Sequence, residues 1–362
     1  TQGLYAIILG HIIGGILLFG AGLIGGRLRQ GSMNTTAFSF GPLGAKGFAF
    51  LNMLQLIGWT SIMIYDAMLA LQELAPLSPM IWTIAIGALV ILWLFIGLHN
   101  TGYIQAIVSV LLLGLTLYMG AHMISQWPSE SSLLSSGNMS FIAALELSIA
   151  MPLSWLPLIS DYTRESKKPF SASLTSATVY TITSIVMYTL GLSAAIFGGG
   201  DSIITIMMNA GLGLAGLIVI IFSTVTTTFM DAYSAGVSST TIYNGASSKG
   251  VAVVVTIVGT IAAILYPMDD ITDFLYLIGS VFAPMIAILL ADYFINRQQV
   301  QTLSAYLVRG LIWSLSVGLY HYMLHSESTI GATLPTFTMA FVVTAIVGFI
   351  SKTAHTSAEI KQ

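Results

Sequence analysis

The chain has 362 residues, of which 56% are hydrophobic and only 7% are charged, and its mean hydropathy is +0.90. Ordinary soluble domains carry about 25% charged residues, so this composition excludes a water-soluble fold. The formal charge of −3 and the scattering of only 11 basic residues argue against a nucleic-acid partner. The absence of cysteine excludes thiolate metal sites and thiol nucleophiles.

Long apolar segments follow one another along the whole chain. A membrane-spanning helix needs about 20 mostly apolar residues, and continuous runs of this length are not the short alternating segments of a membrane barrel. The sequence therefore predicts an all-α membrane fold with eleven spans, at 4–26, 44–72, 79–98, 101–124, 139–161, 172–197, 211–238, 250–267, 271–295, 306–324 and 333–351.

The basic residues predict the orientation of these spans, because Lys and Arg gather in cytoplasmic loops. If the N-terminus lies outside, every Lys and Arg falls in the inner segments, which are 27–46, 162–171, 239–249, 296–309 and the C-terminal tail. The outer loops contain no Lys or Arg, and their charged residues are acidic, such as Glu130 and Asp201. We therefore expect a multi-pass protein of the cell (inner) membrane with a cytoplasmic C-terminus.

The predicted spans also indicate an internal repeat. Many secondary transporters contain two inverted five-helix units, each opening with a helix broken in mid-membrane. Segment 139–161 carries Pro152 and Pro157, and each proline removes a helical hydrogen bond, so we expect the break here. The odd number of spans and the start at Thr1 predict that a first helix is missing. The expected parts are a first repeat lacking its opening helix at 1–124, a second repeat at 139–295 and two accessory helices at 306–351.

The second span carries a polar stripe. Gln55, Trp59, Asp66 and Glu73 lie at i, i+4, i+11 and i+18, which places them on one helical face. Polar groups at membrane depth are functional candidates when they face the interior. Asp66 is a gate or coupling candidate, although it and Glu73 lie close enough to the outer end to be simply solvated. The alternative for Gln55 and Trp59 is an interhelical hydrogen bond and a packing aromatic ring.

Glu146, Ser154 and Trp155 lie on the proline-containing segment. An aromatic ring between the two prolines can stack on a flat heterocycle, although Trp155 can equally pack against a neighbouring helix. Ser154 is a substrate-binding candidate beside it. Glu146 is a second gate or coupling candidate, and its alternative interpretation is a solvated side chain near the outer surface.

The seventh predicted span carries hydroxyl groups and a carboxylate on one face. Thr227 and Thr228 precede Asp231 by four and three residues, and Thr226 lies beside them. Converging oxygen atoms suit a hard cation such as sodium, or a proton. Threonines in membrane helices also bond to their own i−4 carbonyl groups, which would leave much of this run inert.

Two further patterns in the sequence indicate other kinds of site. Tyr65-Asp66 and Gly198-x-Gly200-Asp201 reproduce the paired motifs of presenilin-like intramembrane aspartyl proteases, but Asp201 falls in a predicted outer loop and no Pro-Ala-Leu sequence follows. This protease is a remote alternative. No metal-ligand spacing links the histidines near the spans, which are His11, His99 and His122.

Several short motifs occur in order along the chain: Thr36-Ala37-Phe38-Ser39-Phe40-Gly41, Gln55-x-x-x-Trp59, Ser160-Asp161-Tyr162-Thr163-Arg164, Asp231-Ala232-Tyr233-Ser234-Ala235-Gly236, Phe282-Ala283-Pro284 and Ala291-Asp292-Tyr293. Together they resemble the nucleobase:cation symporter-1 family, which includes cytosine and hydantoin permeases. Within that family the chain is most similar to the branch of hydroxymethylpyrimidine permeases. The resemblance covers the whole chain.

The resemblance implies a LeuT-type fold of inverted five-helix repeats with two accessory helices. It implies that Gln55 hydrogen-bonds a planar substrate while Trp59 and an aromatic ring near Trp155 stack on it. Members that use sodium bind it partly through hydroxyl groups that would here come from Thr226, Thr227 and Thr228. A substrate-binding Asn expected near position 231 is replaced by Asp231. That carboxylate could pair with an aminopyrimidine or carry the coupling proton.

We therefore predict a secondary transporter, not an enzyme, that imports a small pyrimidine-type heterocycle, hydroxymethylpyrimidine or cytosine-like. Import would be coupled to sodium or protons by alternating access across the lipid bilayer, with no cofactor beyond the coupling ion. The alternative within transport is an amino-acid/cation symporter of the same fold. Its substrate carboxylate would need a cation or a helix N-terminus at membrane depth. The sequence does not specify an oligomeric state.

Overall fold

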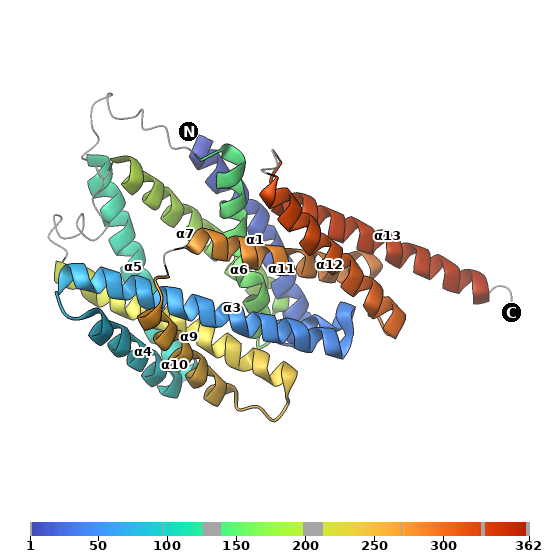
Figure 1. Ribbon diagram of the computed structural model, residues 1–362, viewed down its shortest axis with the longest axis horizontal. Coiled ribbons are helices and arrows are strands. Elements are labelled where there is room, and N and C mark those ends of the chain that lie inside the picture. Colours follow the sequence, from blue (N-terminus) through green and yellow to red (C-terminus); the bar gives the residue numbers. More distant parts are fainter. Residues whose placement is uncertain are drawn as a thin grey trace. The chain divides into compact units, whose positions relative to one another are not determined.

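The computed structural model describes residues 2–96, 98–125, 139–197, 213–268, 270–326 and 330–359. Every regular element in these residues is a helix (Figure 1). In chain order the helices are α1 (Gln2–Leu28), α2 (Ser32–Thr35), α3 (Ala37–Leu74), α4 (Pro79–Ile96), α5 (Leu98–Ser125), α6 (Phe141–Thr163), α7 (Pro169–Phe197), α9 (Gly213–Ile242), α10 (Ser248–Leu265), α11 (Ile271–Leu290), the π-helix η1 (Ala291–Asn296), α12 (Leu303–His325) and α13 (Thr333–Glu359).

Each of the eleven predicted spans coincides with one of these long helices. Within the described residues, ten helices are long and apolar enough to cross a membrane. The remaining predicted span, 101–124, corresponds to α5, in which the shorter stretch Tyr103–Tyr118 is apolar. The all-α membrane fold is therefore confirmed.

The chain forms two compact units. We call the first unit Thr1–Asn52, Met139–Thr183 and Thr272–Gln362, and the second unit Met53–Asn138 and Ser184–Ile271. Each unit takes helices from both predicted repeats, because contacts in space join segments that are far apart in the chain. The repeat boundaries at 1–124, 139–295 and 306–351 stay a prediction.

Close packing of α1 against α6 organises the first unit. A Cβ atom added at Gly10 would lie 2.5 Å from the Ser148 Cβ, and one added at Gly14 would lie 2.7 Å from Pro152 side-chain atoms. Small residues allow helix backbones to approach closely where lipid supplies no hydrophobic driving force between helices. The glycine face of α1 therefore fixes its contact with α6.

Helix α6 is continuous, so the break predicted in segment 139–161 is wrong. Pro152 and Pro157 both lie inside a 23-residue helix. Packing on α1 holds the turn around Pro152 in place, and the Asn52 Nδ2 atom donates to the Pro157 carbonyl oxygen at 3.3 Å. Contacts with α1 and with Asn52 therefore support the helix near both prolines.

The sharp bend in the first unit lies in α3, at Gly41. This residue has φ +68° and ψ 179°, a conformation that only glycine adopts readily. A side chain there would also collide with the Tyr306 ring, because an added Cβ would lie 2.7 Å from Tyr306 Cε2. The Thr36–Gly41 motif therefore ends in a sharp bend that packs against Tyr306 of α12.

The buried basic residue among those described is Arg309. Arg309 was placed in the inner loop 296–309, but it lies within α12 and is buried. Its Nη2 and Nε atoms donate to the two carboxylate oxygens of Asp292, at 3.0 and 3.3 Å. Asn296 Nδ2 donates to the same carboxylate at 2.8 Å. The paired geometry explains how a guanidinium group remains inside the first unit.

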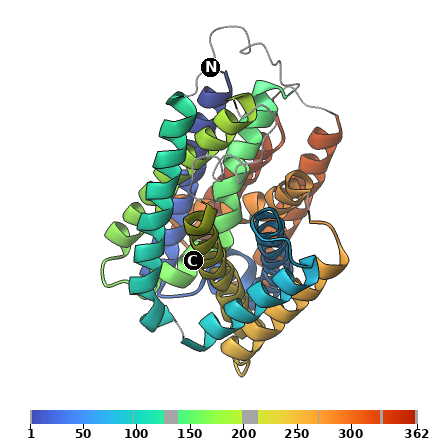
Figure 2. The same cartoon turned by 90° about the vertical axis from the view of Figure 1, so that its left-hand side faces the viewer.

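The second unit has its own apolar core. The later part of α3 supplies Ile64 and Leu71, and these pack in one cluster with residues of α4, α9 and α10 such as Trp93, Phe229 and Ala263. Helices α4, α9 and α10 contact one another, and the pictures show them side by side (Figures 1 and 2). This core packs the later part of α3 against α4, α9 and α10.

Candidate functional site

The polar stripe of α3 divides into a buried and an exposed part. Gln55 is 5% exposed and Trp59 is 9% exposed, whereas Asp66 and Glu73 are exposed. The solvated interpretation therefore fits Asp66 and Glu73. Gln55 and Trp59 lie one turn apart in the second unit, where a buried amide and an indole share one helical face.

The threonine run on α9 separates into two kinds of hydroxyl group. Thr226 and Thr227 both donate to the Ser223 carbonyl oxygen, at 3.0 and 2.9 Å, as expected for threonines in membrane helices. Thr228 is 0% exposed, and its hydroxyl group has no hydrogen-bond partner among the described residues. Leaving a buried hydroxyl unpaired is unfavourable by about 1–3 kcal/mol, so this group is the one most available to a ligand.

Asp231 lies one turn after Thr228 on the same face and is 5% exposed. The ion pairs found in the described part of the chain are Arg164–Glu165 and Arg309–Asp292, so no described cation compensates this carboxyl group. A buried carboxyl group without a cation is unfavourable at membrane depth and is a functional candidate for that reason. Thr228 and Asp231 form the polar face of α9 in the second unit.

Ser154 and Trp155 belong to the first unit and have partners within it. The Ser154 hydroxyl donates to the Met151 carbonyl oxygen at 2.7 Å. The Trp155 ring lies 5.8 Å from the Tyr180 ring, at an interplanar angle of 52°, and the Tyr180 hydroxyl donates to the same Met151 oxygen. These contacts support the packing alternative for Trp155, and the substrate-binding roles of both residues stay predictions.

Glu146 joins α6 to the N-terminus of α13. Its Oε1 atom accepts hydrogen bonds from the backbone N–H groups of Ala332 at 2.7 Å and Thr333 at 2.6 Å. The residue before them, Gly331, has φ +76°, and a Cβ there would lie 2.5 Å from the same oxygen. The side chain is buried, so the solvated interpretation is wrong. The predicted gate or coupling role is untested, but Glu146 caps a helix.

Sequence reasoning did not recognise a tie between the Ser160–Arg164 motif and the start of α2. The Asp161 carboxylate accepts from the Ser32 amide at 2.8 Å, and the Ser160 amide donates to the Ser32 hydroxyl at 3.0 Å. The Thr163 hydroxyl donates to the Gly22 carbonyl oxygen at 2.8 Å. This motif therefore connects the end of α6 to α1 and α2 by hydrogen bonds. The sequence signal for these contacts was the high content of Ser, Asp and Thr in the motif.

The remaining patterns add no site. Gly198, Gly200 and Asp201 of the protease-like pattern lie outside the described residues. His11 is buried and bonds through Nδ1 to the Ile7 carbonyl oxygen at 2.8 Å, while the side chains of His99 and His122 are not described. No group of three or more acidic, histidine or cysteine side chains suited to a metal ion occurs in the described part.

The fold is shared with cation symporters of known structure. The chain superimposes on Mhp1, a nucleobase-cation-symport-1 family transporter in a closed conformation with bromovinylhydantoin bound, with a TM-score of 0.80 at 18% identity over 97% of this chain and 86% of that one. The inward-facing conformation of Mhp1 gives a TM-score of 0.75 at 18% identity, over 97% and 84%. A Na⁺-coupled sialic acid symporter gives 0.66 at 15% identity, over 97% and 88%. These likenesses define a LeuT-type transporter fold, as predicted.

Sequence comparison gives the family. The profile described as "Permease for cytosine/purines, uracil, thiamine, allantoin" matches residues 1–360, and the chain belongs to this family of nucleobase-cation symporters. The cytosine permease of Escherichia coli (strain K12) is 21% identical over 311 residues, which are 85% of this chain and 74% of that protein. The predicted family is confirmed, and these relatives are transporters and not enzymes. The hydroxymethylpyrimidine branch stays a prediction.

Proposed function

We propose that this protein is a secondary active transporter that imports a pyrimidine-type heterocycle, hydroxymethylpyrimidine or a cytosine-like base, together with sodium or protons. The observation that carries the proposal is the buried polar face of α9, where Asp231 has no described cation and the Thr228 hydroxyl has no described partner. In a family of permeases, such a face suits transient occupation by an ion or a substrate. The proposed location is the inner membrane, with the C-terminus in the cytoplasm.

Substrate recognition is assigned to Gln55, Trp59 and Asp231. The Gln55 amide both donates and accepts hydrogen bonds, which matches the alternating donors and acceptors of a pyrimidine edge. The Trp59 indole offers an aromatic face for offset stacking. The Asp231 carboxylate accepts from an exocyclic amino group and favours substrates that carry one. All three residues are buried in the second unit. The substrate-binding roles predicted for Ser154 and Trp155, which belong to the first unit, stay predictions.

The coupling ion is assigned to the polar face of α9. Oxygen atoms suit sodium, and Thr228 offers a hydroxyl oxygen with no internal bond. Thr226 and Thr227 use their hydroxyl protons on Ser223, but their oxygen lone pairs remain available to a cation. In the proton-coupled version, Asp231 carries the proton, and Asp66 or Glu146 contributes to gating.

An amino-acid substrate is the weaker alternative. Its carboxylate would need a cation, and Arg309 is the buried basic residue in the described part of the chain. Both of its paired nitrogen atoms already bind Asp292. A neutral heterocycle needs no such partner.

Thermal stabilisation of the purified protein tests the proposal, because a ligand that binds the folded state raises its apparent stability. Cytosine, hydroxymethylpyrimidine, hydantoin, purines and amino acids would each be added with and without sodium. We expect stabilisation by an aminopyrimidine, loss of that effect in Gln55→Ala, and retention of it in Glu73→Gln, which changes an exposed residue of the same helix. If no aromatic heterocycle shifts the transition, or only amino acids do, the proposed substrate class is wrong.

A further inference from the structure

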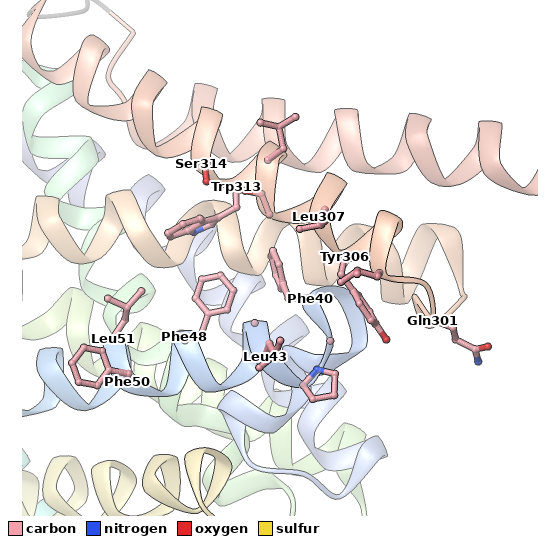
Figure 3. A pocket seen from close by; sticks show the side chains of 17 residues that line it. Phe40, Leu43, Phe48, Phe50, Leu51, Gln301, Tyr306, Leu307, Trp313 and Ser314 are labelled. Atoms are coloured by element: carbon pink, nitrogen blue, oxygen red, sulfur yellow. Dashed lines mark hydrogen bonds between the residues drawn. The ribbon is translucent and has the colours of Figure 1, made fainter.

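A long apolar groove runs along the first unit between α3 and α12. It has a volume of about 1090 Å³ and is lined by residues of α3 between Phe40 and Leu51, by Gln301, and by residues of α12 between Leu303 and Ser314. Figure 3 shows Phe48 and Trp313 facing each other across it, with Gln301 and Tyr306 at one end and Phe50 and Leu51 toward the other. Both helices are long and apolar enough to span a membrane, and the lining from Gly44 to Leu51 and from Tyr306 to Ser314 falls within the predicted spans.

Missing side chains create the groove. Gly47 of α3 and Gly310 of α12 both line it, and a Cβ atom added at either position would meet no atom within 4 Å. Three aromatic rings in the groove contact one another and hold each other in place. The Phe48 ring packs edge-on against Trp313, with ring centroids 5.3 Å apart, and against Phe40, with centroids 4.7 Å apart. A fixed apolar channel left open by glycines fits a flexible chain better than a flat helix face does, since contact atoms surround the occupant on several sides.

Polar and positive groups mark one end of the groove. Gln301 lies at this end, and the Tyr306 hydroxyl donates to the Val300 carbonyl oxygen at 2.8 Å. Lys46, between two groove-lining glycines of α3, and Arg297, four residues before Gln301, are both exposed. The sequence has no acidic residue from Ala37 to Tyr65 or from Tyr293 to Ser326. Lys46 and Arg297 therefore bring positive charge to chain segments that flank the groove and contain no acidic residue.

We propose that the groove binds one acyl chain of an anionic phospholipid, with the lipid phosphate beside Lys46 and Arg297. The basic end coincides with loops predicted to be cytoplasmic, where anionic head groups and basic pockets between spans meet. Lipid tails gain little from hydrophobicity inside a bilayer, so selectivity comes from the shape of the groove and from the charges at its end. The bound lipid contacts both α3, near its bend at Gly41, and the accessory helix α12. Helix α3 also carries Gln55 and Trp59.

The test uses the full-length protein, delipidated in mild detergent, with added phosphatidylglycerol or phosphatidylcholine. Lipid binding is measured by native mass spectrometry and by thermal stabilisation. We expect phosphatidylglycerol to bind more tightly and to raise the transition temperature more. Gly310→Leu and Gly47→Leu fill the groove without a collision and should abolish this difference. Gly318→Leu is the matched control, because it lies on the same helix, outside the groove, and also meets no atom within 4 Å.

Head-group recognition is tested separately with Lys46→Gln and Arg297→Asn, since Asn tolerates the left-handed conformation of position 297 (φ +50°). Each cation near an anionic lipid contributes about 1 kcal/mol, so each change should weaken phosphatidylglycerol binding about fivefold and leave phosphatidylcholine binding unchanged. Equal binding of the two lipids by the native protein would overturn the proposal. So would a dimer that dissociates in Gly310→Leu, since a second copy would then be the occupant. Neither readout depends on transport, so the proposed function is tested independently.

Discussion

The hydrogen bonds of Glu146 lead to a quantitative prediction about the accessory helix α13. One carboxylate oxygen accepts from the amides of Ala332 and Thr333, which would otherwise be unpaired groups at a helix N-terminus. Hydrogen bonds to a charged group contribute about 1.5–3 kcal/mol each, and the helix dipole adds about 0.5–1 kcal/mol. Because the two bonds share one oxygen, we expect Glu146→Ala to lower the free energy of unfolding by about 3 kcal/mol.

Two milder variants separate charge from geometry at this contact. Glu146→Gln keeps an acceptor oxygen and loses the charge, so it should lower the free energy of unfolding by about 1 kcal/mol. Gly331→Ala places a methyl group against the Glu146 carboxylate in a backbone conformation that alanine disfavours, so it should destabilise the protein by about 2 kcal/mol.

Thermal unfolding in detergent measures the order of these effects, and hydrogen exchange at Ala332 and Thr333 measures the contact directly. The control is Glu73→Ala, an exposed glutamate whose loss should change the stability by less than about 0.5 kcal/mol. If Glu146→Ala unfolds at the same temperature as Glu73→Ala, and the two amides exchange as slowly as in the native protein, the capping argument is refuted.

Three further predictions concern buried polar groups. Asp231→Asn should remove the pH dependence of uptake if Asp231 carries the coupling proton; an unchanged profile of uptake against pH would exclude that role. Thr228→Val should raise the stability measured without sodium by about 1 kcal/mol, because it removes an unpaired buried hydroxyl group. It should also raise the sodium concentration needed for half-maximal uptake. Thr227→Val is the control, and equal effects of the two changes would contradict the difference between the two hydroxyl groups. Arg309→Met should destabilise the protein by about 3–5 kcal/mol in chemical or thermal unfolding, because it leaves the Asp292 carboxylate buried without its cation; adding Asp292→Leu should recover much of the loss.

The helices could be predicted from the sequence because each depends on local properties. Whether a 20-residue window can span a bilayer depends on its own apolar content, and all eleven windows became long helices. The break predicted at Pro152 and Pro157 failed for the opposite reason. Proline weakens a helix locally, but α1 packs against this part of α6 through Gly10 and Gly14, and that contact is invisible within the window.

The candidate site was predictable as a set of residue types on helix faces. Periodicity placed Gln55 with Trp59 and Thr228 with Asp231, and the structure buries all four. Periodicity could not tell which hydroxyl group of the run on α9 is left without a partner, because each threonine can bond to a carbonyl group one turn earlier, and only the structure shows that Thr226 and Thr227 do so. Periodicity likewise could not show that the Tyr180 ring lies beside Trp155.

The sequence by itself determined that this protein lies in a membrane, how many long apolar helices it has and, through its motifs, the family to which it belongs. Those properties depend on short stretches of sequence, since the hydropathy of a segment or the presence of a motif does not depend on residues far away in the chain. Only the tertiary structure decided the partners of the buried polar groups. Glu146 meets an amide 186 residues away and Ser32 meets Asp161 across 129 residues, because burial forces each polar group to find whichever partner the packed helices bring within reach.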